Sequence, residues 1–556
     1  MIDVTDDIRR AAQPQWIAHM YAATTGEDHL GLASVSSDQI LPMLSPTINV
    51  LTVHPRYHSF YAFLLDEFWQ RDRPRSPRAW IQFFRPRDFI YSIAMHLCDH
   101  DDHNITGGVT GSRKTGPIAA REPASFDTTT NYIKEPLGGY GLYYRSVLAG
   151  LGLVYPGGPR LPYPVDVPTE EGKKLAAAFR NEIEDTAYYR HDFDQDDAQV
   201  DIEHVREYAR AACLCQLRAP SAADGPILQS HFLDTPEETA PARRATLRVL
   251  LDMADQTDGL PVDQPAFRQL LFFGRASNGA RYTPRADLAE THARWRLYQA
   301  REYYAFALTG MFVSLCDWGI DQAGDLRPVS LDALAEHVAG SLNFGRLAEL
   351  LAVPAPALDG NAPFSALLDW LTGLVGASAD NFDEKCGLDA PISEDALHRL
   401  GQSTGEPASR IAGGIVTLAS LFLRFGHPER WMSPAWTAIS RTGEDGRLSV
   451  DRFMRNLRAR LRNGSPTVFE IAHWLMSDYV VLQHQVVATS KLPDNTFRFE
   501  REGNRLRFHR HYNPLGFSDS RFYALSTTAH ELGFCGAFGA DDHGLEQAGR
   551  DLLAAE

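Results

Sequence analysis

The fold class is decided by residues Ala293–Trp318, which read ARWRLYQAREYYAFALTGMFVSLCDW. This long and strongly apolar run predicts a helix at the centre of a helical bundle. Its uncharged part, Tyr303–Cys316, falls short of the roughly 20 residues that cross a bilayer, and so does Ile411–Leu423. We therefore expect two buried core helices and no membrane span.

Helical patterns continue outward from this stretch. In Arg56–Arg71 the residues Phe60, Phe63, Leu64 and Phe68 recur at the spacing of one helix face. A third helix is expected to begin near Pro466 and to run to about Leu482, because proline is favoured at the first turn. The chain is thus predicted to be mainly α-helical.

The clearest strand signal lies near the carboxyl end. Apolar and basic residues alternate in Thr496–Glu500 and again in Arg505–His509, with the turn residues Gly503 and Asn504 between them. This pattern predicts a β-hairpin with one apolar and one basic face. A helix precedes it and the apolar segment Phe522–Phe534 follows, so we expect a small α+β unit resembling a winged helix.

The length of 556 residues suggests three or four domains, at about 150 residues each. Proline-rich and turn-rich stretches mark the boundaries, above all the five prolines of Tyr155–Pro168. We expect an N-terminal helical domain (1–165), a central helical domain (166–353), a third helical domain (354–465) and the C-terminal helix-hairpin-helix unit (466–556).

Composition and charge narrow the function classes. Lys and Arg number 54 against 71 Asp and Glu, a net charge of −17, so nucleic acid would need a local basic patch. Met1–Arg10 lacks the pattern of a secretory signal, and the six cysteines contain no CxxC pair. We expect a cytoplasmic protein with free thiols. Cys213 and Cys215 fall in a helical pattern, which would point their thiols to different sides.

A dense set of metal-ligand residue types occupies His96–His103, which reads HLCDHDDH. On a continuing helix His96 and His100 would share a face, with Asp99 and His103 close by, and these four residues could hold zinc or manganese. This set would suit a metal-dependent hydrolase or nuclease. The alternative is a polar helix end that enters a loop, since no glutamate stands between the histidines to act as a general base.

Three other segments match known motifs only in part. Gly108–Thr115 resembles a phosphate loop in which Arg113 replaces the second glycine, but no apolar strand precedes it. Asp192–Glu203 has the acidic spacing of an EF-hand loop, with Asp197 where a glycine is needed. Arg71–Arg87 alternates arginine, proline and aromatic residues, and we favour a connector between helices over a surface for single-stranded nucleic acid.

Arginines gather near the carboxyl end. Four lie at helical spacing and four lie in and around the hairpin: Arg452, Arg455, Arg458 and Arg462, then Arg498, Arg505, Arg507 and Arg510. Guanidinium groups match phosphate oxygens, so one shared basic face would bind nucleic acid. The same face could instead meet acidic groups of a partner protein or of another domain.

The first 155 residues contain a set of short, largely aromatic motifs: Leu44-Ser45-Pro46 with Thr52, Arg56–Tyr61, Gly139–Tyr144 and Leu151–Leu153. Through these motifs the segment resembles an uncharacterised family of bacterial proteins. Members are often encoded beside helicases and phospholipase-D-like nucleases in phage-defence gene clusters. The resemblance implies an accessory subunit of a DNA-acting assembly, with a helicase or nuclease as partner, and it carries no catalytic residues.

Three hypotheses result. The first is a non-catalytic DNA-binding or scaffolding subunit of an anti-phage system that acts through the arginines of 452–510. The second is a metal-dependent hydrolase or nuclease built on His96–His103, and the third is a structural adaptor that contacts protein alone.

Overall fold

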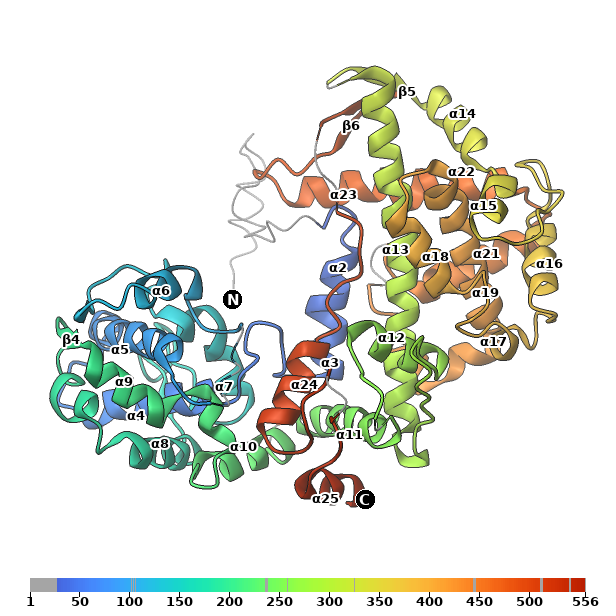
Figure 1. Ribbon diagram of the computed structural model, residues 1–556. Helices are drawn as coiled ribbons and strands as arrows, with labels where there is room; N and C mark the ends of the chain where they lie inside the picture. The colour runs from blue at the N-terminus through green and yellow to red at the C-terminus, as the bar shows by residue number, and fades with distance from the viewer. Residues whose placement is uncertain are drawn as a thin grey trace. The chain divides into compact units, whose positions relative to one another are not determined.

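The computed structural model describes residues 28–555, except 102, 104, 106, 236–238, 258, 325, 444–446, 511–513 and 540–541. These residues are mainly helical, as predicted, with a few short strands (Figure 1). They form two compact units, each assembled from separate stretches of chain. Unit 1 comprises residues 1–40, 268–279 and 292–518, and unit 2 comprises residues 41–267, 280–291 and 519–556.

These units are larger than the four domains expected from the sequence, and they are discontinuous. The expected C-terminal segment 466–556 is divided, because residues 466–518 belong to unit 1 and residues 519–556 belong to unit 2. Contacts between segments far apart in the chain define compact units, and proline-rich breaks do not report such contacts. The finer division into four stays a prediction.

Unit 1 is organised around α13 (Ala289–Ala323), which contains the predicted helix and is buried along most of its length. Its side chains Tyr303, Tyr304 and Phe312 are almost fully buried. The other helices of unit 1 are α2 (Leu32–Ser34), α14 (Leu331–Ser341), α15 (Phe344–Leu350), α16 (Phe364–Leu374), α17 (Phe382–Lys385), α18 (Glu394–Ser403), α19 (Gly413–Phe425), α20 (Pro434–Ile439), α21 (Val450–Asn463), α22 (Val468–Trp474) and α23 (Gln483–Ser490).

One stretch of the described residues, Ala408–Phe425, is long and apolar enough to cross a membrane. It comprises the end-to-end helices η6 (Ala408–Ala412) and α19, and 83% of it is buried inside the protein. Burial of this kind is typical of a core helix, which agrees with the sequence-based expectation for Ile411–Leu423.

The predicted hairpin is confirmed, but the winged-helix arrangement is not. Strands β6 (Phe499–Glu502) and β7 (Arg505–Phe508) pair antiparallel across Gly503 and Asn504. The distant strand β5 (Pro328–Ser330) pairs with β7, which gives a three-stranded sheet in the order β5-β7-β6. The rings of Phe499 and Phe508 are fully buried, so one face of the hairpin packs on the unit 1 core, while Arg501, Glu502 and Arg505 are exposed.

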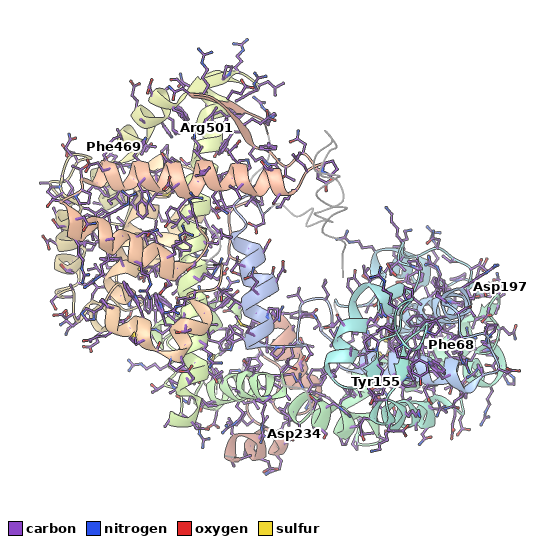
Figure 2. All side chains as sticks on the ribbon, turned by 180° about the vertical axis from the view of Figure 1, so that it is seen from behind. Phe68, Tyr155, Asp197, Asp234, Phe469 and Arg501 are labelled. Carbon is purple, nitrogen blue, oxygen red and sulfur yellow. The ribbon has the colours of Figure 1, made fainter. Side chains whose placement is uncertain are left out.

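Unit 2 has an aromatic core around α4 (Arg56–Gln70), the helix predicted from the Phe60–Phe68 stripe. Phe68 lies inside this unit and Asp197 lies at its surface (Figure 2). The other helices are α3 (Leu41–Leu44), α5 (Pro77–Leu97), α6 (Ser112–Ala119), α7 (Arg145–Gly150), α8 (Glu170–Ile183), α9 (Ile202–Ala212), α10 (Asp224–Leu233), α11 (Ala240–Gln256), α24 (Phe522–Glu531) and α25 (Gln547–Ala554), with α12 (Gln264–Phe273) spanning the boundary in sequence between the units.

Four short strands of unit 2 form two antiparallel pairs. Strand β1 (Ser125–Asp127) pairs with β4 (Gln199–Asp201), and β2 (Val154–Tyr155) pairs with β3 (Val167–Pro168). The first pair leads directly into α9, which packs against α5. This packing brings the ends of two helices together at the site described next.

Candidate metal centre

Four side chains of unit 2 converge at the ends of α5 and α9. They are Cys98, His103, Cys213 and Cys215, whose ligand atoms all lie within 4.8 Å of one another. The Sγ atoms of Cys98 and Cys215 are 3.7 Å apart, and the Sγ atom of Cys213 lies 3.4 Å from Nδ1 of His103. These atoms are the soft sulfur and nitrogen donors that transition metals bind.

These two distances match the edges of a tetrahedron of ligands around a metal ion. Two metal–sulfur bonds of about 2.3 Å that meet at the tetrahedral angle place the sulfurs about 3.8 Å apart. One such bond and a metal–nitrogen bond of about 2.0–2.1 Å place sulfur and nitrogen about 3.6 Å apart. All six cysteines of the chain are free thiols, so no disulfide competes for these sulfurs.

The local backbone explains why the ligands converge. Helix α5 ends at Leu97, and Cys98 follows in an extended conformation (ψ 127°), so the chain leaves the helix at this residue. Helix α9 ends at Ala212, and Cys213 is likewise extended (ψ 145°) before the 3-10 helix η4 (Leu214–Arg218). The expectation that Cys213 and Cys215 point to different sides was therefore wrong, because the helix stops before the first of them.

Buried polar contacts hold the backbone at the end of α9 in place, at Ala212 and Cys213. Nη1 of Arg56 donates to the Cys213 carbonyl oxygen at 2.6 Å, and the Tyr91 hydroxyl donates to the Ala212 carbonyl oxygen at 3.1 Å. Arg56 is fully buried and also contacts the carboxylates of Glu182 and Asp224. Burial lowers the pKa of Arg56, but these two carboxylates outweigh it and raise that pKa.

The three thiols perturb one another strongly. The hydrogen bond with Cys213 lowers the pKa of the Cys98 thiol, but the hydrogen bond with Cys215 and burial outweigh it and raise that pKa to about 11. Hydrogen bonds with Cys213 and Cys98 lower the pKa of Cys215, and Nε2 of Gln216 donates to its sulfur at 3.3 Å. A bound metal ion would deprotonate each thiol that coordinates it.

Of the four ligands predicted from the sequence, the cluster contains only His103. His96 lies at the end of α5, with Nε2 3.3 Å from Oγ1 of Thr115. Asp99 forms an ion pair with Arg210 at 2.8 Å, and Nε2 of His100 lies 2.9 Å from the Arg210 carbonyl oxygen. The helix ends before Cys98, so the spacing assumed for His96, Asp99 and His100 does not apply.

The arginines predicted to form one basic face fall into two groups within unit 1, on α21 and around the hairpin (Figure 1). On α21, Arg452, Arg455 and Arg462 are exposed, and Arg458 is half-buried and donates to the Gly426 carbonyl oxygen at 3.1 Å. Arg455 is paired with Asp451 at 2.7 Å.

The hairpin group is less uniformly exposed. Arg498 is buried, with 7% of its surface exposed, and Arg507 is paired with Glu502 at 2.9 Å. Arg505 and Arg510 are exposed, as is Arg501, labelled in Figure 2. The basic face expected for the hairpin is thus diluted by burial and by Glu502.

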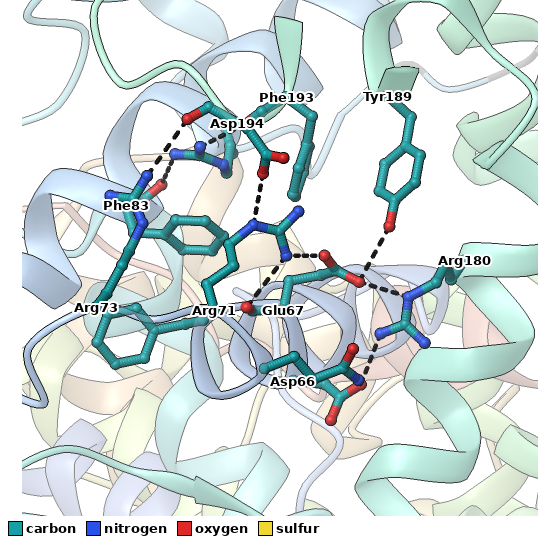
Figure 3. A network of polar contacts seen from close by, with 12 residues as sticks. Asp66, Glu67, Arg71, Arg73, Phe83, Arg180, Tyr189, Phe193 and Asp194 are labelled. Carbon is teal, nitrogen blue, oxygen red and sulfur yellow. Dashed lines mark hydrogen bonds and ion pairs between the residues drawn. The ribbon is translucent and has the colours of Figure 1, made fainter. Parts of the chain in front are cut away.

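The partial EF-hand match and the arginines of 71–87 meet each other in a polar network (Figure 3). Arg71 contacts Glu67 and also Asp194, the latter at 2.5 Å, and Arg73 pairs with Asp196 at 2.6 Å. Arginine side chains thus balance the charges of Asp194 and Asp196. These two carboxylates therefore have cationic partners without a calcium ion. The expected connector is correct only for residues 71–76, which join α4 to α5. Pro77–Arg87 form the first half of α5, so the connector was predicted too long.

Comparisons with protein-family models, with curated proteins and with solved structures gave no match to this chain. The metal-ligand cluster is therefore interpreted from its own geometry alone. A sequence signal for it exists in retrospect: a Cys-x4-His pair (Cys98, His103) and a Cys-x-Cys pair (Cys213, Cys215), each directly after a helix. Pairs this far apart become informative only once α5 and α9 are known to pack together.

Proposed function

We propose that unit 2 binds one Zn²⁺ ion through Cys98, His103, Cys213 and Cys215, and that this ion is structural. The observation that carries the proposal is the pair of distances, 3.7 Å between sulfurs and 3.4 Å between sulfur and nitrogen. Zinc suits a set of three thiolates and one imidazole, whereas manganese prefers oxygen ligands.

A structural role is favoured over a hydrolytic one by the number of ligands. Catalytic zinc keeps a coordination position for water or substrate, while structural zinc is closed by four protein ligands. Here four protein ligands are at hand, and Asp99 and His100 are engaged with Arg210. The ion would tie the end of α5 to the end of α9 and fix the fold of unit 2.

Metal analysis of the full chain tests this proposal. We expect one zinc per chain, and loss of most of it in Cys98→Ser and Cys215→Ser. Cys535→Ala is the matched control, because Cys535 is a buried free thiol of the same unit that belongs to no such cluster among the described residues. Wild-type protein purified without stoichiometric zinc, and unable to take it up, would contradict the proposal.

A second candidate function is nucleic-acid binding by α21. Besides the predicted arginines, α21 carries Arg460, whose guanidinium lies 4.3 Å from the ring centre of Trp474. The two residues line a hollow of about 780 Å³ beside α21. Trp474 is buried and Glu470 and Asp478 also line the hollow, so the support for binding is the exposed arginines of α21, which would attract a nucleic-acid backbone. The family resemblance would place such binding in an assembly with a helicase or nuclease.

Binding of single-stranded and duplex DNA across a salt series tests the second candidate. We expect affinity to fall steeply between about 50 and 200 mM salt. Arg455→Glu with Arg462→Glu should remove binding, while Arg505→Glu on the hairpin should not. No binding at low salt rejects the candidate, and loss in the Arg505→Glu variant alone would assign the binding to the hairpin.

A further inference from the structure

A second site of unit 2 lies beyond the metal-ligand cluster and does not depend on it. A pocket of about 960 Å³ is lined by the glycine-containing loop Gly108–Lys114, by Tyr132–Glu135, and by Val50, Leu51 and Leu142. Its volume is that of a small-molecule site. The loop is the segment that resembles a phosphate loop in sequence.

The loop has a fixed shape that glycine alone permits. Gly108 and Gly111 have φ of +73° and +71°, which residues with a side chain rarely adopt. A Cβ atom on Gly108 would lie 2.7 Å from the His54 ring, and one on Gly111 would lie 2.5 Å from the Tyr132 ring. The backbone is therefore packed closely against two rings and is held in place before any ligand arrives.

The opposite wall is equally constrained. The Arg85 guanidinium donates to the Glu135 carbonyl oxygen at 2.9 Å and to Oδ1 of Asn131 at 2.6 Å. The Tyr132 hydroxyl donates to buried Asp88, which also accepts from the Gly139 amide at 2.8 Å. Such preorganisation lowers the entropy that a ligand must lose on binding.

One feature of the pocket wall favours an anion. Helix α6 begins at Ser112 in this wall, no side chain of the described residues caps its N-terminus, and Arg113 and Lys114 lie exposed in its first turn. A phosphate group there would meet two positive side chains and the positive end of the helix dipole.

Charge at the rim agrees with this assignment. Arg113, Lys114 and Lys134 line the pocket against the single carboxylate of Glu135, although the chain as a whole carries a net charge of −17. Lys114 donates to the Asn131 carbonyl oxygen at 3.1 Å. A local excess of positive charge in a concave site concentrates anions.

The remaining wall is apolar. Val50, Leu51 and Leu142 expose 42%, 54% and 46% of their surface although they line the pocket. We propose that this pocket binds a phosphorylated small molecule of nucleotide size, with its phosphate at the start of α6 and its base on these apolar side chains. Thr115 is buried and bonded to Ser92 at 2.8 Å, so it is not placed to hold Mg²⁺ as in a nucleoside-triphosphatase loop.

Calorimetric titration of the full chain tests the proposal, with AMP, GMP, CMP, UMP, ribose 5-phosphate, inorganic phosphate and adenosine as probes. We expect at least one nucleoside monophosphate to bind saturably without Mg²⁺, and more tightly than ribose 5-phosphate, phosphate or adenosine. If ribose 5-phosphate bound as tightly as every nucleotide, the base would contribute nothing to binding at the apolar wall, and the proposal would be overturned. Adenosine binding as tightly as AMP would equally overturn it.

Charge reversal locates the site. Arg113→Glu and Lys134→Glu should each weaken nucleotide binding by at least about tenfold, because each removes a charge-assisted contact with phosphate. Arg160→Glu is the control, since it reverses an exposed charge of unit 2 outside the pocket, and it should bind as the wild type does. No saturable binding of any nucleotide or of phosphate, or wild-type binding by both pocket variants, would overturn the proposal.

Discussion

The Sγ atoms of Cys98 and Cys215 lie 3.7 Å apart, although 116 residues separate the two cysteines in sequence. A disulfide bond would require about 2.05 Å between the sulfurs, so the two thiols are close without being joined. Together with Cys213 and His103 they form a donor set that would bind a metal ion far more tightly than any one of them alone.

Metal removal should destabilise the wild-type protein. If zinc binds the folded chain alone, free metal at a hundred times Kd adds about 2.7 kcal/mol to the free energy of unfolding. We expect a strong chelator to lower the urea midpoint of the wild type accordingly and to leave Cys215→Ser almost unchanged. Urea unfolding with and without chelator measures both, and equal shifts in the two proteins would contradict a role for Cys215 as a ligand.

Arg56→Ala should be among the most destabilising single substitutions in unit 2. It would leave the fully buried carboxylate of Asp224 without its cation and remove a donor from the Cys213 carbonyl oxygen. Breaking a buried ion pair on one side costs about 3–5 kcal/mol.

The matched control for that change is Arg78→Ala, which removes an exposed arginine of the same unit. We expect Arg78→Ala to change the free energy of unfolding by less than about 0.5 kcal/mol. Denaturant unfolding of both variants provides the comparison. Similar stabilities of the two variants would show that the Arg56 network contributes little, and metal content of Arg56→Ala would report its effect on the cluster.

Local sequence patterns predicted the helices well because helical periodicity is a property of neighbouring residues. The stripe of Arg56–Arg71 and the apolar run of Ala293–Trp318 both became buried helices, α4 and α13. The hairpin followed from its turn residues for the same reason. The third strand of its sheet, β5, could not be predicted, since its pairing with β7 joins segments far apart in the chain.

The metal-ligand cluster escaped prediction for a related physical reason. The end of α9 before Cys213 has no proline or glycine to mark it, and its backbone carbonyls are satisfied by Arg56 and Tyr91 from other helices. Tertiary contacts thus set a helix end that propensity alone would place later. The segment 96–103 does contain two ligands of the cluster, Cys98 and His103. Of the four ligands predicted there, however, His96, Asp99 and His100 form other contacts.

Unit 2 should lose stability as pH rises, because the ion pair between His54 and Glu531 requires a protonated His54. Nδ1 of His54 lies 2.6 Å from Oε1 of Glu531, and Nε2 lies 2.9 Å from the Gly107 carbonyl oxygen. Burial lowers the pKa of His54, but Glu531 and the Gly107 carbonyl outweigh it and raise that pKa above 6.5. A raised pKa in the folded state adds stability below pH 6.5, which is lost as pH rises through the folded value.

Glu531→Gln removes the carboxylate and should abolish this contribution. We expect the difference in melting temperature between the wild type and Glu531→Gln to be large near pH 6 and to shrink toward about pH 9. Thermal unfolding across this range measures it. A difference that stays constant with pH would show that His54 is neutral in the folded protein throughout.

Gly319→Ala tests whether the hairpin belongs to the unit 1 core. A Cβ atom on Gly319 of α13 would lie 2.5 Å from the Phe508 ring, which is fully buried in the sheet. Because the ring must shift to admit the new methyl group, we expect a loss of about 1–3 kcal/mol in the free energy of unfolding.

Gly340→Ala is the control, since nothing lies within 4 Å of a Cβ atom at that helical position of α14. There the substitution should be neutral or should add up to about 1 kcal/mol, as alanine favours a helix over glycine. A hairpin that projected into solvent as a wing would instead leave both variants equally stable in denaturant unfolding.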